Sequence, residues 1–220
     1  MTRIDASVAG VERACAEAAA VVMAGGVVIF PTDTVYGIGC DPVRAASIAR
    51  IFALKGRPAQ KPLSLHFGSV AELLEYAPGN PLAALLARRF LPGPLTIVVA
   101  RPLFVDERVS AGLPTLGLRV PAQPTALALL ERCGPLAATS ANHSGQPAFT
   151  GVGNGAELPE ADLLVLDGPT PLRTESTIID LSTNEPRIVR KGAISQEMLE
   201  HYLGRKIRLP FPVQPNEPQP

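Results

Sequence analysis

Apolar runs of strand length and helical segments follow one another irregularly along this chain, and their order constrains the fold more than any other feature. Short β-branched and aliphatic runs predict strands at residues 27–30, 63–67, 95–100, 116–120, 136–138, 163–166, 177–181 and 187–189. Helices are predicted at residues 11–23, 42–54, 70–76, 81–90, 125–133 and 195–203. Several strands succeed one another with no helix between them, which excludes a pure βαβ repeat. The order therefore predicts an α/β fold on a mixed, twisted sheet.

The length and composition favour a single folded domain. A chain of 220 residues is long enough for one large domain, and no sharp boundary divides residues 1–208. Hydrophobic residues make up 46% of the chain, which supports a packed core rather than disorder. Residues 209–220 are rich in proline and have few apolar partners, so this tail is predicted to be extended or disordered.

Charge and cysteine content narrow the class of protein. Twenty basic and twenty acidic residues cancel, so no overall field draws the chain to nucleic acid or membrane, although a local basic patch is still open. Cys15, Cys40 and Cys133 are far apart and lack metal-ligand or redox spacing. The N-terminus has no secretory pattern, and the apolar run at residues 18–30 is shorter than the roughly 18 residues a membrane helix needs. We therefore expect a soluble protein of the reducing cytoplasm.

Three polar stretches, at residues 31–37, 55–58 and 139–145, each follow an apolar segment. Ligand groups in α/β sheets gather where strands end. Short hydroxyl and amide side chains, lysine as a point charge and arginine as a planar fork all suit phosphate or carboxylate oxygens. Each stretch alone is also explained as a structural turn. Together they predict one anion-binding pocket assembled from loops.

Lys55, Arg57 and Lys61 place three cations within seven residues at the predicted end of a helix. Such cations can simply complement the negative end of the helix dipole. However, Pro58 and Pro62 stiffen the segment and so fix the direction of the long basic side chains. The segment is therefore equally well explained as a site for a polyphosphate.

Single polar residues inside apolar strands can likewise have either a structural role or a role in a binding site. An inward-facing Arg119 would need an anionic partner, because an unpaired buried charge is costly. Asp33 could cap a backbone turn or contact a metal, and His66 is most simply a satisfied core or surface histidine. The spacing of the histidines supports no zinc site, and no P-loop, dinucleotide-binding or nucleophile-elbow motif occurs.

Eight short segments occur in the order typical of one family, and they span about residues 12–203. They are PTDTVYG at 31–37, KGRP at 55–58, KPL at 61–63, PGPLT at 92–96, GLRVP at 117–121, TSAN at 139–142, EST at 175–177 and RKG at 190–192. The chain resembles the YrdC-type threonylcarbamoyl-AMP synthases in a short, single-domain form. Their Lys-x-Arg and Ser-x-Asn pairs together are highly specific.

The resemblance implies a catalytic domain at residues 1–208 whose mixed sheet, flanked by helices, surrounds a large concave cavity. It implies condensation of L-threonine, bicarbonate and ATP to threonylcarbamoyl-AMP and pyrophosphate, the first step of threonylcarbamoyl-adenosine formation on tRNA. A tRNA threonylcarbamoyltransferase complex would receive the product, and direct tRNA binding is left open. Mg²⁺ would arrive with ATP and have few protein ligands, because no carboxylate cluster is visible.

The resemblance also assigns residues by match to the motifs. Lys55 and Arg57 would be catalytic. ATP would be bound by Lys55, Arg57, Lys61, Ser140, Asn142 and Arg190. Threonine would be held by Thr32, His66, Arg119 and Ser176.

Two other classes of function are weighed against this one. An RNA-binding module without ATP turnover would use the concave surface, but neutral charge and 5% aromatic residues give it little support. A carbamoyl-transfer domain like those of hydrogenase maturation shares the Lys-x-Arg and Ser-x-Asn pairs. Dependence of ATP conversion on threonine separates all three.

Overall fold

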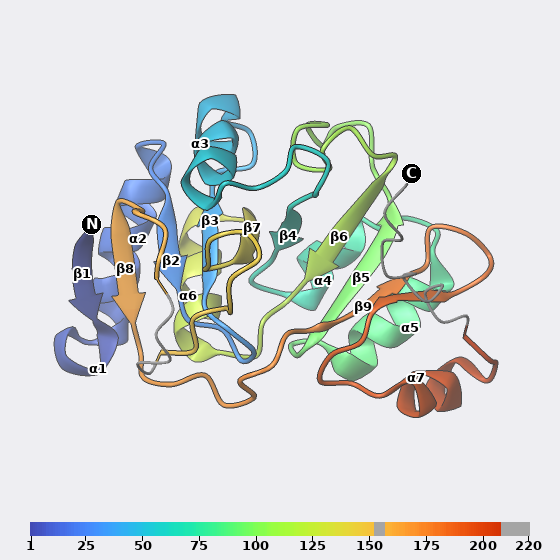
Figure 1. Cartoon of the computed structure of the whole chain (residues 1–220). Coiled ribbons are helices and arrows are strands. Elements are labelled where there is room, and N and C mark those ends of the chain that lie inside the picture. The colour runs from blue at the N-terminus through green and yellow to red at the C-terminus, as the bar shows by residue number, and fades with distance from the viewer. Residues whose placement is uncertain (152–156, 208–220) are drawn as a thin grey trace, which may run out of the picture.

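The computed structural model describes residues 1–151 and 157–207. Within them one sheet of ten strands has the order β1-β8-β2-β3-β7-β4-β6-β5-β9-β10 (Figure 1). The strands are β1 (Thr2–Asp5), β2 (Val28–Phe30), β3 (Gly37–Cys40), β4 (Ser64–His66), β5 (Leu95–Ala100), β6 (Thr115–Arg119), β7 (Leu136–Ser140), β8 (Leu163–Leu166), β9 (Thr177–Asp180) and β10 (Arg187–Arg190). The helices are α1 (Ala6–Ala9), α2 (Val11–Met23), α3 (Ala45–Lys55), α4 (Val70–Glu75), α5 (Pro81–Phe90), α6 (Pro124–Cys133) and α7 (Gln196–Leu203).

The sheet is mixed, which confirms the predicted fold class. Strand β8 pairs in parallel with β1 and β2, β4 with β6, and β5 with β9. The pairs β2–β3, β3–β7, β4–β7, β5–β6 and β9–β10 are antiparallel. This register places Gly37 beside Ser140 and Ser64 beside Ala138. The three polar stretches predicted from the sequence therefore meet at one end of β3, β4 and β7.

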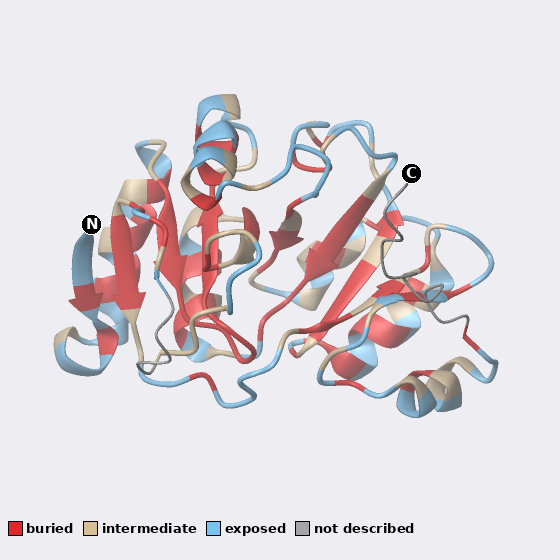
Figure 2. Cartoon of the chain, in the orientation of Figure 1, coloured by how far each residue is buried: buried red, intermediate tan, exposed pale blue. Residues whose placement is uncertain are grey.

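All residues of strands β2 and β3 are buried (Figure 2). Successive residues of a strand point to opposite faces, and in β2 Val28 and Phe30 join a different apolar cluster from Ile29. The Val28 cluster includes residues of α2 and α6, whereas the Ile29 cluster includes residues of α3, α4, α5 and α7. This two-sided burial explains why the strands read as continuous apolar runs.

Two predicted boundaries are wrong near the first polar stretch. Residues 37–40 form strand β3, although no strand was predicted between residues 30 and 63. Gly37 and Gly39 lie so close to the Phe30 ring that a β-carbon at either would come within 3.1 Å of it. The following helix begins at Ala45 rather than Pro42. The Asp41 carboxylate accepts a hydrogen bond from the Val43 amide at 3.0 Å, so it forms a turn and does not cap the helix.

Strand β1 and helix α1 were not predicted, because each is very short and exposes most of its side chains. The other elements agree with the predictions to within about two residues. Asn80 and Ser195 cap α5 and α7 by accepting from the amides of Ala83 and Met198. The proline-rich tail at residues 209–220 lies outside the described residues, so the boundary at residue 208 stays a prediction. None of the described helices is both long and apolar enough to span a membrane.

Candidate active site

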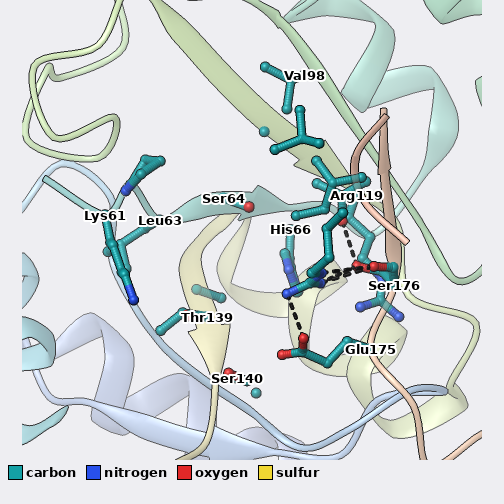
Figure 3. Close-up of a pocket in the computed structure, with 18 of the residues that line it drawn as sticks. Lys61, Leu63, Ser64, His66, Val98, Arg119, Thr139, Ser140, Glu175 and Ser176 are labelled. Atoms are coloured by element: carbon teal, nitrogen blue, oxygen red, sulfur yellow. Dashed lines mark hydrogen bonds and ion pairs between the residues drawn. The ribbon is translucent and has the colours of Figure 1, made fainter. Parts of the chain in front are cut away.

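A cavity of about 620 Å³ lies over one face of the sheet at β4, β5, β6 and β9 (Figure 3). Alternate residues of these strands line it, because every second side chain points to the same face. They are Ser64 and His66, Thr96 and Val98, Thr115, Gly117 and Arg119, and Ile178 and Asp180. The residues between them, such as Leu65, Ile97 and Leu118, are buried in the core. This alternation accounts for Arg119 and the hydroxyls within apolar strands, and the volume suits a small-molecule site.

Loops that carry predicted site residues form the rest of the wall. All of the predicted site residues except two line the cavity: Thr32, Arg57, Lys61, His66, Arg119, Ser140, Ser176 and Arg190. The two exceptions are Lys55 and Asn142. The structure thus brings eight of the ten predicted residues to one cavity, while anion binding and the role of each side chain stay predictions.

Lys55 and Asn142 lie behind the cavity wall, where they brace the loop after β7. Lys55 is only 2% exposed, and its Nζ donates to the main-chain oxygens of Ser140 and Asn142 and, at 3.2 Å, to Asn142 Oδ1. Asn142 Nδ2 donates to the main-chain oxygens of His143 and Gln146 at 2.9 and 2.7 Å. Both side chains therefore shape the wall that presents Ser140, and neither faces the cavity in this arrangement.

This burial makes a pH-dependent prediction for Lys55. Burial, followed by repulsion from Arg57, lowers the pKa of the Lys55 ammonium from 10.5 to about 7. The unfolded chain therefore binds more protons than the folded chain between these two values, and stability rises with pH across that window. We expect the unfolding free energy of the wild type, minus that of Lys55→Met, to be smallest below pH 7 and to increase toward pH 10.5.

Denaturant unfolding of both proteins at about pH 6, 8 and 9.5 measures this difference. Lys61→Met is the matched control, because it removes a lysine of the same segment that is exposed rather than buried. A wild-type minus Lys55→Met difference that stays constant or falls with pH contradicts the prediction.

Arg57 and Arg190 supply fixed positive charge to the cavity. Arg57 donates from Nε and Nη2 to the main-chain oxygens of Lys61 and Pro62 at 3.0 and 2.7 Å. Arg190 donates from Nε and Nη2 to the main-chain oxygen of Ser176 at 3.1 and 3.0 Å. Both guanidinium groups line the same cavity, and burial, followed by repulsion from Arg190, lowers the pKa of Arg57. Such an arrangement attracts an anion.

Arg119 has the anionic partner that its burial was predicted to require. Arg119 Nη2 lies 2.6 Å from Asp33 Oδ1, and these side chains are 6% and 5% exposed. Nε of the same arginine donates to the Gly93 oxygen at 3.2 Å, and Asp33 Oδ1 also accepts from the Ala122 amide at 3.1 Å. The Asp33 carboxylate therefore links its loop to Arg119 and to the segment after β6, and it does not cap a turn of its own as one of its two expected roles required. For the other role, the described residues hold no group of three or more His, Cys, Asp or Glu placed for a metal.

The hydroxyl groups in the cavity are oriented by hydrogen bonds. Thr32 Oγ1 donates to the Val35 oxygen at 2.6 Å and accepts from the Thr34 amide, so it stabilises its own turn. Ser176 Oγ lies 2.9 Å from Thr96 Oγ1 and accepts from Arg190 Nη2 at 3.1 Å. Because these hydroxyl groups are already oriented, they need little reorganisation when a substrate binds.

His66 is a neutral group in the cavity wall. Burial and, to a smaller extent, the nearby Arg119 charge lower its pKa to about 3. Its Nδ1 is buried and has no hydrogen-bond partner among the described residues. The expectation of a satisfied core histidine is therefore not met for this nitrogen.

The sequence analysis gave no role to Glu175 or Thr96, although both line the cavity. Both lie inside segments that carried the family resemblance, EST and PGPLT. Alternation of Thr96 with apolar neighbours in a predicted strand was a signal that could have found it. Glu175 had no comparable signal, because its importance depends on the arginine that the fold brings next to it.

The fold and the site define an α/β protein with a small-molecule cavity that is lined by cations and oriented hydroxyls. The profile of the Sua5/YciO/YrdC family, described as telomere recombination, matches residues 20–192. The chain belongs to this family.

Relatives of known name support the same assignment. The threonylcarbamoyl-AMP synthases of Pyrococcus abyssi and Bacillus subtilis are 39% and 37% identical over 191 and 194 residues. These matches cover 85% and 86% of this chain but 56% of each relative, so the chain spans little more than half their length. The crystal structure of P. abyssi Sua5 complexed with L-threonine is similar with a TM-score of 0.86 and 36% identity, over 94% of this chain and 62% of that one.

Proposed function

We propose that this chain is an L-threonylcarbamoyladenylate synthase, a nucleotidyltransferase of the cytoplasm that acts in tRNA modification. The observation that supports it most directly is the convergence of Arg57, Lys61 and Arg190 with two serine hydroxyls on one cavity of about 620 Å³. A relative of the same family, which this chain matches over most of its own length, is described as complexed with L-threonine.

The reaction needs a site that holds several anions together. The threonine amine combines with bicarbonate to give a carbamate and water. A carbamate oxygen then attacks the α-phosphorus of ATP, the bond from that phosphorus to the bridging oxygen breaks, and pyrophosphate leaves. The attacking carbamate and the triphosphate are both negative, so cations close to both lower the electrostatic barrier.

The arrangement of the side chains suggests how the two substrates are divided. Arg57, Lys61 and Arg190 would bind phosphate oxygens, with Ser140 presented by the loop that Lys55 and Asn142 brace. Threonine would be surrounded by four other residues of the cavity lining: His66, Arg119, Ser176 and Thr32. Holding reactants in an attack geometry can lower the barrier by about 7–11 kcal/mol. No protein nucleophile is needed.

The residues of this site fit Mg²⁺ only as an ion that is bound together with ATP. Within the described part of the chain no three-residue acidic or histidine cluster exists, and the cavity carboxylates Glu175 and Asp180 are each paired with an arginine. The ion would therefore be held through the phosphates, where it would neutralise charge on the leaving pyrophosphate. The adenylate would pass to a tRNA threonylcarbamoyltransferase complex.

The test is pyrophosphate release from ATP, with threonine and bicarbonate each present or omitted. We expect release only when both are present, and threonylcarbamoyl-AMP as the product by mass spectrometry. ATP conversion that does not depend on threonine would favour the carbamoyl-transfer alternative. Salt-dependent binding to RNA without any ATP conversion would favour the RNA-binding module.

A further inference from the structure

A carboxylate is paired with one of the cations that face the cavity. Glu175 Oε2 lies 2.9 Å from Arg190 Nη1, and the two side chains are 42% and 38% exposed. Both line the cavity. Among the described residues this is the only ion pair or hydrogen bond of the Glu175 side chain, so Arg190 alone holds the carboxylate in place.

Arg190, in contrast, is held independently of Glu175. Its Nε and Nη2 donate to the main-chain oxygen of Ser176, which leaves Nη1 for the carboxylate. The backbone after Arg190 also packs tightly on the backbone of Glu175, since a β-carbon on Gly192 would lie 2.4 Å from the main-chain oxygen of Glu175. Loss of the Glu175 carboxylate should therefore free Nη1 without moving the guanidinium.

The charge of Glu175 also acts on more than its direct partner. It raises the pKa values of Arg190, Arg57 and Lys55, in each case against the larger effect of burial. A single carboxylate thus offsets part of the repulsion between the two arginines that line the cavity and the buried Lys55 behind its wall.

We propose that Glu175 is an internal counter-ion, which occupies the anion position of Arg190 in the empty site and is displaced by a phosphate oxygen of the substrate. This inference rests on the proposed function, because that function makes Arg190 a phosphate ligand. Phosphate binding then exchanges one ion pair for another. Because the carboxylate must first be displaced, the exchange lowers the affinity of the site for every anion. It disfavours polyphosphates least, because their other phosphate groups contact further residues of the cavity and so help to displace the carboxylate.

The test measures binding of inorganic pyrophosphate by calorimetry to the wild type, Glu175→Gln and Glu175→Asp. We expect Glu175→Gln to bind about fivefold more tightly, as the loss of one partly exposed ion pair predicts. Glu175→Asp keeps the charge but is too short to reach Nη1 in the same way, so it should bind about twofold more tightly. Glu160→Gln, an exposed acid outside the cavity lining, makes the same change in charge and should match the wild type.

Each other outcome overturns the inference in a recognisable way. Tighter binding by Glu175→Gln with unchanged binding by Glu175→Asp means general repulsion without displacement. Weaker binding by Glu175→Gln means that the carboxylate supports the position of Arg190. Both leave the proposed function intact, whereas a wild type that binds neither pyrophosphate nor ATP removes the function and the inference together. Thermal unfolding without ligand shows that each variant is folded.

Discussion

Replacement of Arg57 by alanine is expected to slow pyrophosphate formation by roughly 10²–10³-fold, the size of effect seen when one preorganised charge donor is removed. Arg57 lines the cavity, and its guanidinium is fixed on the main-chain oxygens of Lys61 and Pro62. Alanine would remove both the charge and its fixed position. The measurement is the initial rate of pyrophosphate release with saturating threonine and bicarbonate.

Two further variants test whether the loss of rate is specific to the Arg57 guanidinium. Arg57→Lys keeps the charge but lacks the planar guanidinium that donates from two fixed nitrogens, so we expect an intermediate rate. Arg88→Ala removes an exposed arginine of α5 and should leave the rate unchanged. A near-normal rate in a folded Arg57→Ala protein would exclude Arg57 from the reaction. Arg57 is a better target than Lys55, because replacement of buried Lys55 also removes the donor for three oxygen atoms of the wall.

Replacement of Asp33 by alanine is expected to lower the free energy of unfolding by about 3–5 kcal/mol. The change leaves Arg119 buried with its charge unpaired and deprives the Ala122 amide of its acceptor. A loss of this size is a large part of the roughly 5–15 kcal/mol that stabilises a typical domain. Urea unfolding of the variant and the wild type measures the difference directly.

An exposed pair provides the comparison for Asp33. Asp106 lies 2.6 Å from Arg108, the same separation as Asp33 from Arg119, but the Arg108 side chain is 59% exposed. Asp106→Ala should therefore cost less than about 1 kcal/mol. If the two aspartate variants lose equal stability, burial does not determine the contribution of the Asp33–Arg119 pair.

Local sequence predicted much of the fold, because the relevant forces act between near neighbours. The caps at Asn80 and Ser195 satisfy amide groups three residues further on, so they are visible in the sequence. Strand β3 could not be recognised from the sequence, because glycine usually weakens a strand. Only the structure shows that Gly37 and Gly39 lie where the Phe30 ring leaves little room for a β-carbon. The helix after Asp41 starts late for a similar reason, since the same residue types that cap a helix also close a turn.

The candidate site shows the same division between local and distant effects. Its hydroxyl-rich and cation-rich segments could be found in the sequence, and so could the need of Arg119 for an anionic partner. The identity of that partner as Asp33, the pairing of Glu175 with Arg190 and the burial of Lys55 away from the cavity could not be found. Each of these depends on the approach of segments that are distant in the chain.

The sequence by itself determined most of the helices and strands, that the sheet is mixed, and which loops carry groups able to bind anions. It could do so because propensity, capping and alternation are properties of neighbouring residues. Only the tertiary structure decided which of those groups face the cavity and which are paired beneath it. The side an ionisable group faces, and the partner that neutralises it, are set by strand order and register, which bring residues such as Asp33 and Arg119 within 2.6 Å across 86 positions of sequence.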